Sequence, residues 1–189
     1  MRHRMRISAL GVDGGEREGE GEGGAVHIEH TVTLPAALDD IARVGVRLAF
    51  DDTRGDDTEW VGRGPHESYN DRCASARFGR WRSAVAGWHV PYVHPQGCGN
   101  RHDVKKLRVG RVHIDADQLL DVTVSHFTDE DLHAASHQDE LQPRPEAYVW
   151  LDAAHRGVGT GAVGPDTLPR YRVPTGEHRW SYVLRLDEA

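Results

Sequence analysis

The sequence predicts an all-β fold, an antiparallel β-sandwich that contains one short helix. Three observations carry the prediction: short runs of alternating apolar and polar residues, clusters of turn-forming residues between them, and a single helical segment. Alternation places every second side chain on the same face of a strand, so each run can bury one face and expose the other. No internal repeat is visible.

The N-terminal part of the chain is expected to hold several strands and one loop. Residues 1–25 are assigned to an N-terminal strand and a flexible Gly/Glu-rich loop, because the stretch 11–24 has no apolar side chain after Val12. Pro35 ends the alternating run that follows this loop. The strands expected next cover residues 26–33, 44–50 and 57–62, with a polar turn over residues 51–57.

The C-terminal part is predicted to contain long connections, one helix and four more strands. Periodicity fades over residues 64–103, where Gly, Pro, Arg and aromatic residues dominate, as in connections that cross one end of a sheet. Thr128 is the expected N-cap of the helix, with Asp131 three residues on, and the helix continues over Leu132–His137. The four strands are expected at residues 111–114, 120–126, 148–151 and 180–186.

The composition bounds the class of protein and its partners. The formal net charge of -7 argues against a nucleic-acid partner, which needs a basic face. Hydrophobic residues make up 38% of the chain, and no apolar run approaches the length of a membrane span or follows the basic N-terminus as in a signal peptide. We therefore expect no membrane partner and a cytoplasmic location, with Cys73 and Cys98 as free thiols.

A metal site is the first chemistry to consider, because the chain has 13 histidines. His94, Cys98 and His102 are spaced as ligands on one helical face would be, and they are ligand types that zinc prefers. Pro95 and Gly97 lie inside the run, so a helix is not expected there, and no fourth ligand stands out. We expect a polar loop and no metal site.

Paired carboxylates and nucleotide-binding glycines are weaker candidates. The chain lacks the G-x-S-x-G pattern of a nucleophile elbow, and the glycines of residues 157–161 lack the full G-x-G-x-x-G spacing. Acidic residues are abundant, and most acidic residues are simply solvated. The carboxylates near aromatic or Gly-rich segments, where a sugar would approach, are Glu67, Asp71, Asp103 and Asp152.

The segment 60–72 (WVGRGPHESYNDR) is more informative than any of these. Gly62 and Gly64 permit a sharp turn or a close approach of another segment. Glu67 and Arg72 are expected to pair and to order the loop. A second rigid stretch follows at residues 91–95, where prolines flank Tyr-Val-His.

Together these segments resemble the C-terminal domain of family 2 β-galactosidases. The resemblance covers roughly residues 26–186 and rests on the order of its motifs, above all GRGPHESY at 62–69 and GNRHDV at 99–104. The motif residues, to which we assign a structural role, are Gly64, Pro65, His66, Glu67, Tyr69, Arg72, Asn100, Arg101 and Asp103.

The resemblance implies a fold for this chain and a separate catalytic barrel for the reaction. The family's domain is an antiparallel β-supersandwich similar to galactose mutarotase, which here would occupy residues 26–189 and be truncated on its N-terminal side, leaving strand edges unpaired. Both catalytic glutamates of the family lie in a central barrel that precedes this domain, so no catalytic residue is expected in this chain. The catalytic barrel is the implied partner, and Mg²⁺ and Na⁺ ions are allowed in the complete enzyme but no cofactor is expected here.

The resemblance also implies a link to substrate through one loop. In the family, a loop from this domain closes over the active site, and it falls here at residues 157–165. The residues expected to contact a β-galactoside in the assembled enzyme are Gly159, Thr160 and Val163. Val163 stands where well-known members have a Trp on which the sugar stacks, and a branched aliphatic residue offers no aromatic platform.

Three hypotheses about function follow. The first is a domain of a β-galactosidase, active in retaining hydrolysis of terminal β-galactosides only with a barrel. The second is a stand-alone carbohydrate-binding module that uses Trp60, Trp88, Tyr92 and Trp150, although such rings are more often core residues in a sandwich. The third is an inactive truncated product.

Overall fold

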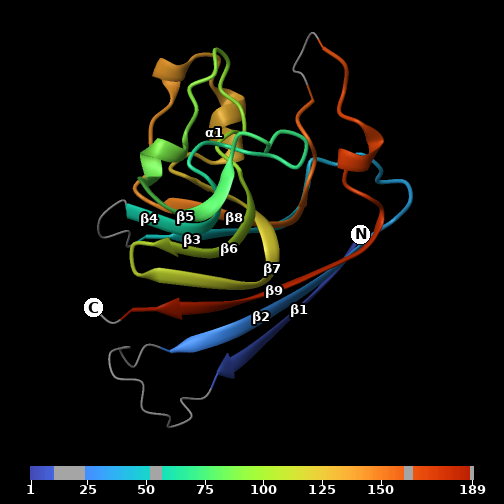
Figure 1. Cartoon of the computed structure of the whole chain (residues 1–189), viewed down its shortest axis with the longest axis vertical. Helices are drawn as coiled ribbons and strands as arrows, with labels where there is room; N and C mark the ends of the chain where they lie inside the picture. The colour runs from blue at the N-terminus through green and yellow to red at the C-terminus, as the bar shows by residue number, and fades with distance from the viewer. Residues whose placement is uncertain (11–23, 52–56, 160–163, 188–189) are drawn as a thin grey trace.

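The computed structural model describes residues 1–10, 24–51, 57–159 and 164–187. These residues form an antiparallel sheet of nine strands with little helix, which confirms the predicted all-β fold (Figure 1). The strands are β1 (Arg2–Leu10), β2 (Ala25–Leu34), β3 (Arg43–Phe50), β4 (Asp57–Gly64), β5 (Arg77–Ala84), β6 (Arg101–Val109), β7 (Val112–Ser125), β8 (Ala147–His155) and β9 (Gly176–Leu186). The helix α1 covers Asp129–Ala134, and 3₁₀ turns lie at η1 (Val85–Trp88), η2 (Gln138–Glu140) and η3 (Pro169–Tyr171).

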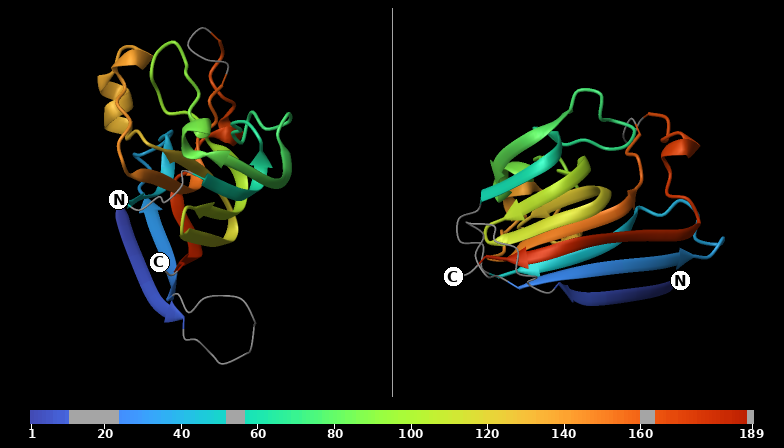
Figure 2. Two further views of the ribbon diagram at one scale, coloured as in Figure 1. Left: turned by 90° about the vertical axis from the view of Figure 1, so that its left-hand side faces the viewer. Right: turned by 60° about the horizontal axis from the view of Figure 1, so that its bottom comes forward.

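The long strand β7 is the point at which the sheet divides. Residues Val112–Ala116 of β7 pair with β9, which continues to β2 and β1. Residues Asp121–Ser125 of β7 pair instead with β8, which continues to β3. On its other side β7 pairs with β6, followed by β4 and β5. On one side of β7 the sheet therefore divides into two arms, β9–β2–β1 and β8–β3. The loops and α1 gather above the sheet (Figures 1 and 2).

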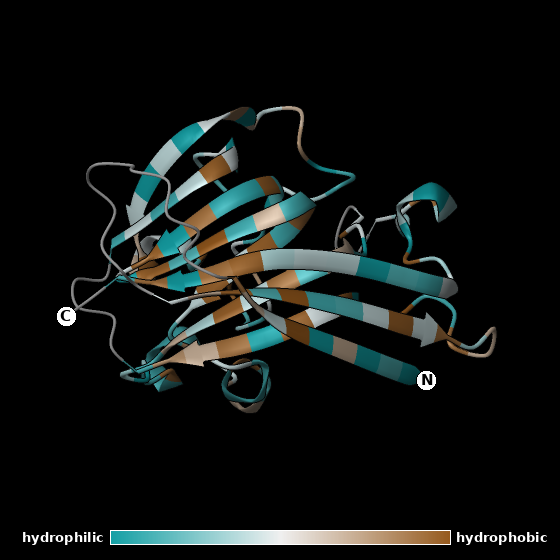
Figure 3. Cartoon of the chain, turned by 90° about the horizontal axis from the view of Figure 1, so that it is seen from below, coloured by the Kyte–Doolittle hydropathy of each residue, from teal (hydrophilic) through white to brown (hydrophobic). Residues whose placement is uncertain are grey.

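One hydrophobic core joins the two arms. Side chains from both arms, such as Leu151 on β8 and Tyr182 on β9, belong to a single cluster of buried residues. Trp60 of β4 and Trp88 of η1 lie against each other there, with ring centroids 4.8 Å apart. Hydrophobic and hydrophilic residues alternate along several strands (Figure 3), and β4 shows the result most clearly, since every second residue of it is buried.

Several predicted elements need correction. The expected strands at 111–114 and 120–126 are one continuous strand, β7, in which Asp115 and Ala116 still pair with β9 beyond the end of the first predicted strand. The connection predicted over 64–103 contains β5 and the start of β6. The helix has the predicted cap but ends at Ala134, short of His137. The predicted Gly/Glu-rich loop and most of the turn at 51–57 lie outside the described residues. No helix in the described part of the chain is long and apolar enough to cross a membrane.

Candidate functional site

The loop after β4 is ordered around the Glu67 carboxylate. Arg72 donates to it over 2.5 Å, which confirms the predicted pair. Tyr69 and Tyr92 also donate their hydroxyls to it, and the backbone N–H of Gly99 does so over 3.0 Å. Glu67 thus ties its own loop to the segment that precedes β6. The Tyr69 side chain is buried, and this burial raises the pKa of its hydroxyl.

Asn100 continues this connection into the sheet. Its side-chain amide donates to the Ser68 carbonyl and to Asp121 of β7, both over 2.8 Å. The His102 ring lies 2.9 Å from the same carboxylate oxygen of Asp121. Burial alone would lower the pKa of His102, but the hydrogen bond and the charge of Asp121 carry it above its ordinary value.

Three of the other motif residues have plain structural roles. Arg101 is buried, with its guanidinium 4.6 Å from the ring centroid of Trp88, and burial lowers its pKa to about 10. Asp103 accepts from Arg63 over 2.6 Å. His66 lies 2.9 Å from the Ser75 hydroxyl.

The remaining two motif residues shape the start of the loop after β4. A Cβ atom at Gly64 would lie 2.7 Å from the Trp81 ring, so only glycine fits there. The peptide bond from Gly64 to Pro65 is cis.

Asp71 connects the loop after β4 to both ends of the loop 157–165. Its carboxylate accepts from the backbone N–H of Val158 over 3.2 Å and of Gly159 over 2.8 Å, and from the Thr167 hydroxyl over 2.9 Å. A Cβ atom at Gly157 would lie 2.6 Å from this carboxylate, so the glycine permits the close approach. Of the predicted substrate contacts, Gly159 lies in this stem, whereas Thr160 and Val163 lie outside the described residues.

A set of ion pairs holds the same stem from another side. Arg156 donates to Asp166 over 2.8 Å and to Asp40 over 2.5 Å, and Arg172 donates to Asp166 over 2.9 Å. The hydrogen bond from Arg156 lowers the pKa of Asp40. Sequence reasoning missed these pairs, because Asp40 and Arg156 are 116 residues apart and charged residues are common in the chain.

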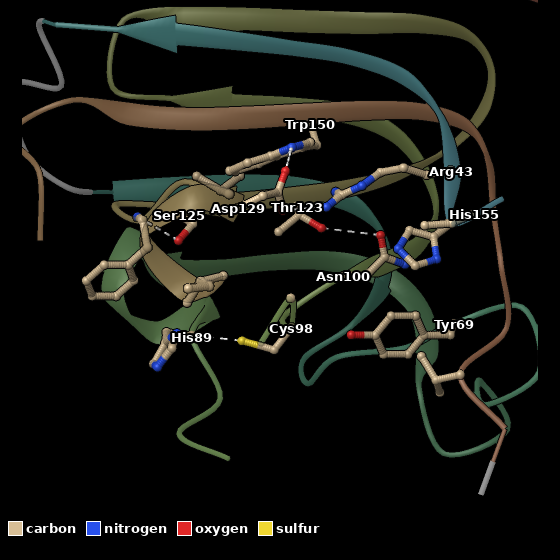
Figure 4. A pocket seen from close by; sticks show the side chains of 16 residues that line it. Arg43, Tyr69, His89, Cys98, Asn100, Thr123, Ser125, Asp129, Trp150 and His155 are labelled. Carbon is tan, nitrogen blue, oxygen red and sulfur yellow. Dashed lines mark hydrogen bonds and ion pairs between the residues drawn. The ribbon is translucent and has the colours of Figure 1, made fainter. Parts of the chain in front are cut away.

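A cavity of about 190 Å³ lies beneath these loops. Tyr69 and His155 line one side, Cys98 and His89 another, and Trp150 closes it toward the sheet (Figure 4). Burial lowers the pKa of His155, so this wall favours a neutral imidazole. Of the four rings named for a carbohydrate-binding module, those of Trp60, Trp88 and Trp150 are buried, as expected for core residues, and that of Tyr92 is half-buried.

The carboxylates and metal-ligand candidates considered in the sequence each have other partners in the structure. Glu67, Asp71 and Asp103 are each held by the contacts described above, and the fourth carboxylate, Asp152, is 1% exposed. The three metal-ligand candidates contact different groups: His94 the Ser136 carbonyl, Cys98 the His89 ring and His102 the Asp121 carboxylate. Within the described residues, no group of three or more His, Cys, Asp or Glu side chains lies together as metal ligands would.

The fold and the loops define this chain as an antiparallel β-sandwich domain with a cavity and with hydrogen bonds and ion pairs at the stem of one loop. The model of the family described as β-galactosidase small chain matches residues 20–186, so the chain belongs to this family. A β-galactosidase of Aeromonas hydrophila is 32% identical over 166 residues, which cover 86% of this chain and 16% of that protein. β-Galactosidases of Vibrio cholerae and Psychromonas ingrahamii are 36% and 37% identical, over 85% and 72% of this chain. The chain spans about a sixth of the length of such relatives.

Proposed function

We propose that this chain is the non-catalytic sandwich domain of a β-galactosidase and that it holds the loop 157–165 over the active site of a barrel supplied by the rest of the enzyme. The observation that carries the proposal is the double attachment of the loop stem, through Asp71 and through Arg156. A loop whose two ends are fixed loses less conformational entropy when it closes over a substrate. Thr160 and Val163 are the side chains that we expect to contact the sugar.

The barrel would supply the chemistry. Retaining hydrolysis of a terminal β-galactoside needs two carboxyl groups about 5 Å apart, and the carboxylates singled out in this chain are hydrogen-bonded or buried. We attribute any Mg²⁺ or Na⁺ requirement to the remainder of the enzyme. The two free thiols, Cys73 and Cys98, fit a cytoplasmic location.

Mixing experiments test the division of labour. We expect the purified chain to leave a chromogenic β-galactoside intact and to restore turnover when mixed with a barrel-containing portion that lacks this domain. Turnover by the chain alone would contradict the proposal. Sugar binding without turnover in either condition would favour a carbohydrate-binding module instead.

Asp71 tests the loop itself in the mixed enzyme. Replacing Asp71→Asn removes charge from the acceptor of three hydrogen bonds at the stem. We expect kcat/KM to fall at least about tenfold, since a misplacement of about 1 Å can cost on the order of 100-fold. The matched control is Glu177→Gln, which removes an exposed carboxylate paired with Arg179 on β9 and should leave kcat/KM unchanged. Equal kcat/KM values for Asp71→Asn and the unmodified chain would refute the capping role.

A further inference from the structure

Cys98 and His89, from the connection between η1 and β6, form a connected set with Gln138 of η2 beside the cavity. The Sγ atom of Cys98 lies 3.6 Å from Nδ1 of His89, and both side chains line the cavity (Figure 4). On its other side, the His89 ring places Nε2 at 2.9 Å from Oε1 of Gln138. A nucleophile, a base and a group that orients the base are the parts that activate a cysteine.

The hydrogen bonds of Gln138 determine which nitrogen of His89 carries the proton. The side-chain nitrogen of Gln138 donates to the Tyr92 carbonyl over 2.6 Å, so its oxygen faces His89. An amide oxygen only accepts, so Nε2 of His89 is the donor. In the neutral ring, Nδ1 then has a free lone pair directed at the thiol of Cys98.

Two further contacts support proton transfer from the Cys98 thiol to Nδ1 of His89. The backbone N–H of Val90 donates to Sγ over 3.3 Å, which favours negative charge on sulfur. The ring of Phe127 packs edge-on against His89 at 5.2 Å and restricts the orientation of the imidazole.

We propose that Cys98 is a nucleophilic thiol with His89 as its general base and Gln138 as the positioning residue, and that it is a modification site for small uncharged electrophiles. The cavity of about 190 Å³ admits small reagents and limits large ones. With iodoacetamide, Sγ bonds to the methylene carbon as the carbon–iodine bond breaks. The thiol proton moves to Nδ1, iodide leaves, and the imidazolium returns its proton to water.

The charges around Cys98 indicate when the proton moves. Burial raises the pKa of the Cys98 thiol, and Glu67 raises it further, while the Val90 hydrogen bond and Arg101 act in the opposite direction. The resting Cys98 side chain is therefore a neutral thiol. The proton is transferred as the new bond forms, so alkylation should be slower in heavy water.

The test measures alkylation by iodoacetamide at each cysteine, using peptide mass spectrometry on the intact chain near pH 7. Cys73 is the reference, since it is also a partly buried free thiol. We expect Cys98 to react at least about tenfold faster than Cys73, and His89→Gln to remove that advantage. An unchanged rate at Cys73 shows that the variant remains folded.

Gln138→Leu gives a second test that leaves the base in place. It removes the acceptor of Nε2 and should slow Cys98 several-fold without affecting Cys73. A rate at Cys98 no higher than at Cys73 overturns the proposal. So does a fast rate that persists in His89→Gln, which would mean that exposure alone controls the reaction.

Discussion

At the scale of single residues, Asp152 has the most unusual environment. It lies on β8 beside Gly45, where a Cβ atom would come within 2.0 Å of its carboxylate, and its nearest cation, Arg43, is 3.7 Å away. Burial, opposed by the charge of Arg43, raises its pKa to about 7. A folded-state pKa above the unfolded value means that the unfolded chain ionises first. Asp152 therefore lowers stability as pH rises from about 4 to about 7.

Asp152→Asn should remove this dependence, because an amide does not titrate in this range. We expect the free energy of unfolding of the variant, relative to the unmodified chain, to increase by roughly 2 kcal/mol between pH 5 and pH 8, because each pKa unit corresponds to about 1.4 kcal/mol. Urea denaturation at both pH values measures it. Asp131→Asn is the control, since the Arg144 hydrogen bond lowers the pKa of Asp131 and both states are ionised over this range. A difference for Asp152→Asn that does not change with pH would show that the carboxyl is ionised throughout.

Residue roles were predictable from sequence where the partners are close along the chain. The Glu67–Arg72 pair spans five residues and the cap of α1 spans three, and both are present as predicted. The contact between Cys98 and His89 spans nine residues in an irregular loop, and the Gln138 contact spans 49, so no periodicity could indicate them.

At the scale of elements, α1 depends on its cap. Six residues are too few for a helix to be stable alone. The Thr128 hydroxyl accepts from the N–H of Asp131, and Asp131 in turn accepts from the N–H of Thr128 and from Arg144. Thr128→Val keeps the shape of the side chain and removes the acceptor. We expect it to lower the free energy of unfolding by about 1–2 kcal/mol.

Thr128→Ser is the matched control for this prediction, because serine retains the hydroxyl of the cap. Urea denaturation gives the stability, and hydrogen exchange at the amide of Asp131 reports the local effect. If Thr128→Ser and Thr128→Val lose equal stability, packing of the methyl group is responsible and not the cap.

The sequence pattern did not predict β5 and β6, because neither strand has regular apolar alternation. β5 exposes most of its residues, so its sequence has no apolar alternation. β6 has register shifts between Arg101 and Lys106, and each shift breaks the period-two pattern. Strands β2, β3, β4, β8 and β9 keep a regular ladder or one clearly buried face, and the alternation located them.

At the scale of the whole molecule, the site depends on contacts that no local pattern contains. Asp71 reaches Gly159 across 88 residues, and Asp40 reaches Arg156 across 116. The assignment of residues 157–165 to the family's capping loop rests on the resemblance to β-galactosidases and stays a prediction. The contacts of its described stem follow only from the folded sheet, which brings the ends of distant strands together.

The edge strand β1 exposes apolar side chains on one of its faces. All nine of its residues are exposed, and among the described strands it pairs only with β2. Met5 and Ile7 are 53% and 57% exposed on the face that β2 continues with His30 and Ile28. An apolar, one-sided edge promotes association, although arginines on the opposite face oppose it.

We expect the isolated chain to self-associate with rising concentration in sedimentation velocity, and Ile7→Lys to suppress this without a large loss of thermal stability, since the side chain is mostly exposed. Ser8→Lys adds the same charge to the opposite face of β1 and should leave association in place. A chain that stays monomeric at high concentration, or an equal effect of both lysines, would show that the apolar face of β1 does not drive the contact.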